Sequence, residues 1–283
     1  MAAARAPQLG PGLRIKSPPY QPGYTLIADP QRSPLRWITL GRLVLSAGQR
    51  RYQASTGGSE LVLDVFAGFC TVTVQGSSGG DFAVGGRSDA FSAAPAMLYL
   101  PAGCDYTIEC PSGECLAALF SAPAPGNGFR PVLVTSEQTA VREVGRDNWS
   151  RRVMTSIGEN VAACRLIVGE TLNPPGNWSS APPHKHDSHR PPQEAVMEEV
   201  YYFQLQPSQG FGFVRVYTDP DDPEPFDEAY AIEDGDTVLI PRGYHPVVAG
   251  PGYRLHYTWA LAGEERRYGA WSDDPRHAWI KGQ

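Results

Sequence analysis

Apolar residues occur along the chain in short runs, each bounded by glycine, proline, asparagine or aspartate, and a helical periodicity is hard to find. The runs cover residues 37–45, 61–66, 69–74, 97–100, 106–109 and 115–120 in the first half, and 163–168, 200–205, 211–217, 237–240, 247–249 and 255–261 in the second. Runs of this length with turn-forming residues between them are typical of β-strands. The pattern predicts an all-β chain built as a sandwich or small barrel, not from βαβ units.

The two halves of the chain share a pattern, which predicts a duplicated domain. Glu60 and Glu199 each lead into an apolar run, and the stretches 99–103 and 239–243 both carry a Pro-x-Gly turn. The acid lies 41 residues before this proline in the first half (60 to 101) and 42 before it in the second (199 to 241). Such self-similarity indicates two β-barrels in tandem. Their junction is predicted within 123–151, which opens with Pro-Ala-Pro-Gly-Asn-Gly.

Composition agrees with a β-rich chain and restricts its partners. Glycine (30) and proline (27) are abundant and charged residues make up 19%, a balance unsuited to a helical bundle. The net charge of −6 argues against nucleic acid as the main partner, because phosphate binding needs a basic surface. No apolar stretch approaches the roughly 18 residues of a membrane-spanning helix, and residues 1–13 lack the apolar core of a secretory signal. Five scattered cysteines are not a disulfide framework, so we expect reduced thiols and a cytoplasmic protein.

The histidines are distributed unequally between the two halves. All six lie in the second half, and the first half has Asp105 where the second has His245. A metal is therefore expected only in the second barrel. The first barrel is expected to serve as a scaffold, or as an interface in a homo-oligomer.

Histidine and glutamate residues of the second half have a spacing typical of a metal site. His184 and His186 are two residues apart, so on a strand their side chains point to the same face. A glutamate of the next strand and His245, after the Pro-x-Gly turn, would complete a shell of three nitrogens and one oxygen. Such a shell suits one divalent transition metal, with zinc or manganese expected first and iron, nickel or cobalt as alternatives. Glu198 and Glu199 are both available; the repeat favours Glu199, and Glu198 would then face outward.

Four motifs resemble one known family. They are 176–187 (Gly-Asn-Trp-Ser-Ser-Ala-Pro-Pro-His-Lys-His-Asp), 198–202 (Glu-Glu-Val-Tyr-Tyr), 212–218 (Gly-Phe-Val-Arg-Val-Tyr-Thr) and 241–246 (Pro-Arg-Gly-Tyr-His-Pro). With weaker matches elsewhere they span most of the chain, which resembles 5-deoxy-glucuronate isomerase of myo-inositol catabolism, a relative of the 4-deoxy-uronate ketol-isomerases. The resemblance implies a bicupin, that is, two tandem cupin (jelly-roll β-barrel) domains with a metal in the C-terminal one. It also implies the ligand set His184, His186, Glu199 and His245.

The repeat and the resemblance together predict five segments. These are a flexible N-terminal tail (1–20), an N-terminal cupin without metal ligands (21–125), a linker (126–150), a C-terminal metal-binding cupin (151–265) and a C-terminal tail (266–283). His277 lies in the last segment and is expected to belong to a docking tail.

The reaction implied by the resemblance converts 5-deoxy-D-glucuronate, an aldose, to 2-deoxy-5-keto-D-gluconate, a ketose. A base must move a proton between neighbouring carbons, and a metal-held hydroxide, Glu198 and Tyr201 are the candidates. Arg215 and Arg242 are expected to bind the carboxylate of this small sugar acid, since a guanidinium binds a carboxylate in two places. Two alternatives fit the same ligands: a metal-dependent dioxygenase, and a sugar-acid-binding bicupin without turnover.

Overall fold

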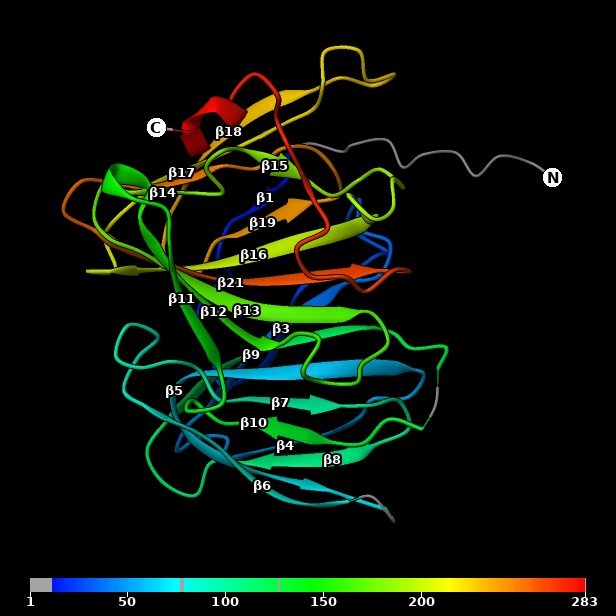
Figure 1. Cartoon of the computed structure of the whole chain (residues 1–283). Helices are drawn as coiled ribbons and strands as arrows, with labels where there is room; N and C mark the ends of the chain where they lie inside the picture. Colours follow the sequence, from blue (N-terminus) through cyan, green and yellow to red (C-terminus); the bar gives the residue numbers. More distant parts are fainter. Residues whose placement is uncertain (1–11, 77–78, 127, 283) are drawn as a thin grey trace.

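The chain folds into two β-barrels that lie one above the other in Figure 1. In this computed structural model, residues 12–76, 79–126 and 128–282 are described. The first barrel contains β2 (Gly23–Ala28), β3 (Thr39–Leu45), β4 (Arg51–Ser55), β5 (Ser59–Val74), β6 (Gly80–Arg87), β7 (Met97–Leu100), β8 (Asp105–Glu109), β9 (Cys115–Pro123) and β10 (Val132–Val134). The second contains β1 (Arg14–Ile15), β11 (Ala140–Val144), β12 (Arg151–Ile157), β13 (Leu166–Asn173), β14 (Trp178–Ser179), β15 (His184–Lys185), β16 (Met197–Gln206), β17 (Gly212–Tyr217), β18 (Asp227–Ile232), β19 (Thr237–Ile240), β20 (Val247–Ala249), β21 (Arg254–Gly263) and β22 (Ser272–Asp273).

The strands of the two barrels pair in matching order. In the second barrel a seven-stranded sheet follows the order β1-β19-β16-β21-β13-β12-β11, and a four-stranded sheet follows the order β14-β20-β17-β18. In the first barrel the path β10-β7-β5-β9-β3-β2 corresponds to the seven-stranded sheet, with β4, β6 and β8 paired beside it. The described residues also contain two short 3-10 helices, η1 (Asp147–Trp149) and η2 (Ala278–Gly282), and hold no helix that is long and apolar enough to cross a membrane.

Strand β5 is longer than the sequence predicted. Residues 59–74 form one strand that bends at register shifts around Gly68, so its first half pairs with β7 and β9 and its second half with β6 and β8. Gly68 has φ +81°, and a Cβ there would lie 1.9 Å from the carbonyl oxygen of Glu114. Only glycine fits this bend, and the sequence shows it as a gap between two apolar runs.

Segments outside the two predicted domains complete the sheets. Strand β1 pairs with β19 at the edge of the second barrel, although it precedes the first barrel in the chain. The predicted linker 126–150 supplies one edge strand to each barrel, β10 beside β7 and β11 beside β12. In the predicted C-terminal tail, β22 pairs with β15. These segments therefore contribute strands to the barrels, while residues 1–11 of the predicted N-terminal tail lie outside the described residues.

The strand register corrects the alignment of the two halves by one residue. Glu199 pairs with the last residue of β19, and Leu61 pairs with the last residue of β7. Glu60 therefore corresponds to Glu198, not to Glu199. At the position of Glu199 the first barrel carries Leu61, whose side chain cannot bind a metal.

Glu60 and Glu198 join the two barrels in a reciprocal way. The Glu60 carboxylate of the first barrel accepts hydrogen bonds at 2.6–2.7 Å from the backbone N–H groups of 164–166, which lead into the second barrel. The Glu198 carboxylate of the second barrel accepts hydrogen bonds at 2.5–2.8 Å from the N–H groups of 36–38 in the first. Both carboxylates are buried. Each supplies the acceptors for three backbone donors that would otherwise be unsatisfied where a strand begins.

A buried ionic cluster lies in the same contact between the barrels. The Arg87 guanidinium of β6 bonds to Glu170 of β13 at 2.9 Å and to Asp64 of β5 at 3.2 Å. His256 lies 3.1 Å from the Glu170 carboxylate, and the Thr258 hydroxyl donates to Asp64 at 2.9 Å. All five side chains are buried, so each charge depends on its partners in the cluster for compensation. His256 is therefore part of the contact between the barrels, away from the histidines of the predicted metal site.

Candidate metal centre

Three buried side chains of the second barrel converge on one point. His186 follows β15, Glu199 lies in β16, and His245 lies in the turn between β19 and β20. Their ligand atoms all lie within 4.8 Å of one another. The Nε2 atoms of His186 and His245 are 3.1 and 3.2 Å from the same Oε2 atom of Glu199. A group of this composition can hold a divalent transition metal.

Backbone carbonyl groups orient the two imidazoles. His186 Nδ1 lies 2.7 Å from the carbonyl oxygen of Met197, and His245 Nδ1 lies 2.8 Å from that of Gly243. A carbonyl oxygen only accepts, so both Nδ1 atoms carry the proton, and in the neutral form that binds a metal both Nε2 atoms present a lone pair. These lone pairs face the Glu199 carboxylate, and His245 Nε2 has no hydrogen-bond partner among the residues that the structure describes. A cation between the three side chains would resolve this repulsion, so the residues present fit a bound metal.

The electrostatics of the group favour an ionised glutamate. Burial alone would raise the pKa of Glu199, but its close contacts with the His186 and His245 imidazoles outweigh burial and lower the pKa to about 2. Burial would lower the pKa of His186, and the contact with Glu199 outweighs this effect and raises it. The carboxylate is thus available as an anionic ligand across the physiological range of pH.

His184 lies beside these three residues without joining their contact. Its ring centroid is 4.8 Å from that of His245 and 6.3 Å from that of His186. Burial, and then the neighbouring His245 and His186, lower the pKa of His184 well below its usual value. A neutral imidazole is the form that binds metals, and the assignment of His184 as the fourth ligand stays a prediction.

The C-terminal segment holds His184 from the other side. Trp271 stacks on the His184 ring, with centroids 5.0 Å apart and an interplanar angle of 30°. The adjacent pairing of β22 with β15 brings this tryptophan to the site. The region predicted as a tail therefore forms one wall of the candidate metal centre.

A Trp271→Ala variant is expected to bind zinc about 10-fold more weakly, because the His184 imidazole loses the group that orients it. Titration of the zinc-loaded protein with a competing chelator measures the change. Trp279→Ala is the matched control, since Trp279 lies in the same segment and is 59% exposed. Equal metal affinity in both variants would show that Trp271 has no orienting role.

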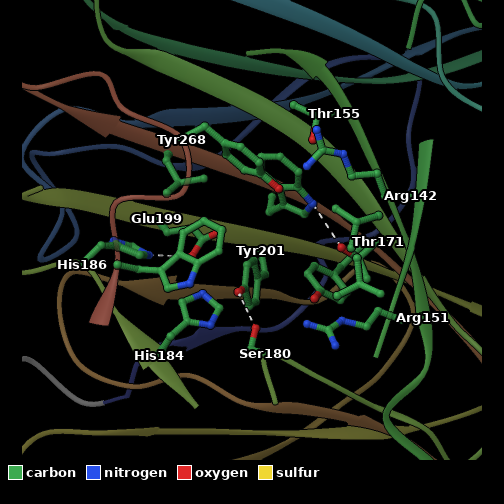
Figure 2. Close-up of a pocket in the computed structure, with 16 residues that line it drawn as sticks. Arg142, Arg151, Thr155, Thr171, Ser180, His184, His186, Glu199, Tyr201 and Tyr268 are labelled. Carbon is green, nitrogen blue, oxygen red and sulfur yellow. Dashed lines mark hydrogen bonds and ion pairs between the residues drawn. The ribbon is translucent and has the colours of Figure 1, made fainter. Parts of the chain in front are cut away.

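His184, His186 and Glu199 lie at one end of a cavity of about 280 Å³. Its hydroxyl-bearing side chains are Thr155, Thr171, Ser180, Tyr201, Tyr257 and Tyr268. Tyr201, a predicted catalytic residue, lies between the ends of the cavity in Figure 2, with its hydroxyl 3.5 Å from Ser180 Oγ. Burial, and then the charge of Glu199, raise the pKa of Tyr201 well above its usual value. Its phenol is therefore protonated at neutral pH.

The other three predicted site residues do not face this cavity. Glu198 is directed to the first barrel, which gives no support to its predicted role in proton transfer. The Arg215 side chain lies on the outer surface and pairs with Asp227 at 2.7 Å. The Arg242 guanidinium binds the Asp222 carboxylate and a backbone carbonyl outside the barrel. The alternation of side chains explains Glu198, because its neighbour Glu199 occupies the inward-facing position.

Two arginines that the sequence did not single out line the cavity instead. Arg142 comes from β11 and Arg151 from the start of β12. Charged and polar residues interrupt the apolar positions of both strands, so the continuous apolar run that marks other strands is missing.

Two jelly-roll barrels in one chain, one of them with a buried His–Glu–His group, define a bicupin with a candidate metal centre, and solved structures support this class. An IolB-like protein from Salmonella typhimurium LT2 matches with a TM-score of 0.87 and 28% identity, covering 96% of this chain and all of that one. An oxalate decarboxylase from Lactobacillus farciminis matches with a TM-score of 0.64 at 12% identity, covering 97% of this chain and 91% of that one. At such low identity the second match shows the fold alone.

The family follows from the sequence comparisons. The model of the KduI/IolB family matches residues 16–280, and the chain belongs to this family. Curated relatives include the 5-deoxy-glucuronate isomerases of Geobacillus thermodenitrificans, 39% identical over 70% of both chains, and of Shouchella clausii, 34% identical over 91% of this chain and 93% of that one. The predicted bicupin fold and the predicted family of isomerases are confirmed.

Proposed function

We propose that this chain is a metal-dependent aldose–ketose isomerase that converts 5-deoxy-D-glucuronate to 2-deoxy-5-keto-D-gluconate in myo-inositol catabolism. The observation that carries the proposal is the convergence of His186, Glu199 and His245, two of which, His186 and Glu199, line a cavity rich in hydroxyl groups. The curated relatives are named 5-deoxy-glucuronate isomerase, which supports the same substrate for this chain. The donor set suits zinc or manganese first, with iron, nickel or cobalt as alternatives.

The chain's own residues bind and orient the sugar acid. A bound metal would supply Lewis-acid chemistry at the carbonyl end of the substrate. The neutral phenol of Tyr201 donates a hydrogen bond to a substrate oxygen, and the Ser180 hydroxyl donates its own hydrogen bond to the phenol oxygen. Aromatic side chains of the C-terminal segment, Tyr268 and Trp271, exclude water from the cavity.

The experiment that tests the proposal is a turnover assay on the purified protein before and after chelation. Proton NMR follows loss of the aldehyde signal of 5-deoxy-D-glucuronate and gain of the ketose. We expect chelation to abolish turnover and one divalent metal to restore it. Absence of turnover in a metal-loaded sample would contradict the proposal. Oxygen consumption would then favour a dioxygenase, and binding without turnover a sugar-acid-binding bicupin.

Two further properties belong to the proposal. The five cysteines are free in the structure, which suits a reducing compartment, and we assign the protein to the cytoplasm. Assembly into a homo-oligomer through the metal-free first barrel stays a prediction.

A further inference from the structure

The cavity has two chemically different ends. Figure 2 shows His184, His186 and Glu199 on one side, Arg142 and Arg151 on the opposite side, and Tyr201 with Ser180 between them. One end thus offers ligands for a cation, and the other offers two cations. A ligand that satisfies both ends carries metal-binding oxygens at one end and an anionic group at the other.

The two arginines have no acidic partner among the residues that the structure describes. Arg151 makes one hydrogen bond, from Nη1 to the carbonyl oxygen of Trp149 at 3.2 Å, which leaves most of its N–H groups free. Its neighbour Arg152 points outward from the same strand and pairs with Glu143 at 2.7 Å. The hairpin of β11 and β12 thus contains an acid, Glu143, but this acid pairs with the outward-facing Arg152 and not with Arg151.

Burial makes the missing partner of Arg151 significant. Its side chain is half-buried, and burial lowers the pKa of the guanidinium. A cation that leaves water without a counter-charge is destabilising, so an anionic ligand at this end would gain binding energy. Arg142 lies at the exposed rim of the cavity, where its charge acts chiefly on the approach of an anion.

We propose that Arg151 forms a two-point contact with the carboxylate of the substrate, and that Arg142 steers the anion into the cavity. The pair makes the cavity selective for sugar acids over the corresponding neutral sugars. This inference rests on the proposed function and adds residues and a basis for specificity to it. It also replaces Arg215 and Arg242, which already have acidic partners on the outer surface.

The test compares two sugars that differ at one carbon. Isothermal titration calorimetry on the zinc-loaded protein measures the affinity for D-glucuronate and for D-glucose. We expect Arg151→Gln to weaken D-glucuronate binding about 30-fold, the effect of removing one partner of a desolvated charge pair, and to leave D-glucose binding unchanged. Arg152→Gln is the matched control and is expected to retain the preference for the acid. Arg151→Lys keeps the positive charge but loses the planar guanidinium that binds a carboxylate at two points. Its affinity for D-glucuronate is expected to lie between those of Arg151→Gln and Arg152→Gln.

Steady-state kinetics distinguish a role of Arg151 in substrate binding from a role in the chemical step. If 5-deoxy-D-glucuronate is turned over, Arg151→Gln should raise KM about 30-fold with a much smaller change in kcat. Arg142→Gln should reduce the dependence of kcat/KM on ionic strength. Zinc content checks each variant, and if the glutamine variant does not hold zinc, the lysine variant decides.

Three results would overturn the inference: a wild-type protein that binds both sugars equally, an Arg151→Gln variant that keeps the preference, or an Arg152→Gln variant that loses it. If the protein shows no turnover but still prefers D-glucuronate to D-glucose in a way that depends on Arg151, the proposed reaction is contradicted and the anion-binding role of Arg151 is supported.

Discussion

A His245→Ala variant is expected to lose its bound metal and to lower kcat by about 10³-fold, which corresponds to the several kcal/mol that a Lewis acid contributes to a transition state. His245 is fully buried, and its Nε2 atom is directed at Glu199 with no other partner among the described residues. Alanine leaves Glu199 with a single imidazole. The imidazole lies in a turn, so the β-rich fold should persist. Metal content by mass spectrometry, circular dichroism and the turnover assay measure the three effects.

His189→Ala is the control for this variant. His189 lies in the loop after the metal-binding motif, is 63% exposed and contacts Glu265 at 3.1 Å. The His189→Ala variant should retain its bound metal and a wild-type kcat. If His245→Ala retains its metal and full turnover, His245 is a structural histidine, and the proposed metal site at His186, Glu199 and His245 is wrong.

A Glu198→Gln variant is expected to lower the free energy of unfolding by about 3 kcal/mol, because an amide replaces the charged acceptor of three buried N–H groups. For a chain of this size the change lowers Tm by about 6–12 °C. The kcat of the folded, metal-loaded variant should stay close to wild type, because the Glu198 carboxylate binds residues 36–38 and not the cavity. Differential scanning calorimetry and the turnover assay report the two quantities separately.

Two comparisons make this prediction specific. Glu143→Gln removes an exposed ion pair with Arg152, and such pairs contribute about 0–1 kcal/mol. Glu60→Gln removes the reciprocal contact and should destabilise the protein as Glu198→Gln does. An unchanged Tm combined with a large fall in kcat would restore Glu198 as the proton-transfer group.

Burial decided which strands could be predicted from the sequence. The central strands β7, β19 and β20 coincide with apolar runs, because they are largely buried on both faces. Strands β4, β11 and β18 were missed because their residues alternate between half-exposed and exposed or are mostly exposed. The run 163–168 was predicted to begin too early, since the N–H groups of 164–166 bind Glu60 and β13 starts at Leu166.

The candidate site was predictable to the extent that its chemistry is local in sequence. The motif of His184 and His186, with Glu199 and His245, carries its own spacing, and the structure brings three of the four into contact. Glu199 does not correspond to Glu60 in the repeat, yet the alternation of side chains along β16 places it in the inward-facing position that was predicted. The arginines were different. Arg142 and Arg151 lie on polar strands whose position depends on pairing with β12 and β13, and no local pattern reports such pairing.

Two strand pairs of the second barrel join segments that are far apart in the sequence, which affects when the candidate metal centre can form during synthesis. β1 leaves the ribosome more than two hundred residues before its partner β19, and β15 precedes its partner β22 by most of a barrel. In a nascent chain, the strand that carries His184 therefore has no partner until the last residues emerge. Loading of the proposed metal is therefore expected only in the finished polypeptide. A chain that ends before β22 would contain all four predicted ligands but would lack the strand that pairs with β15 at His184.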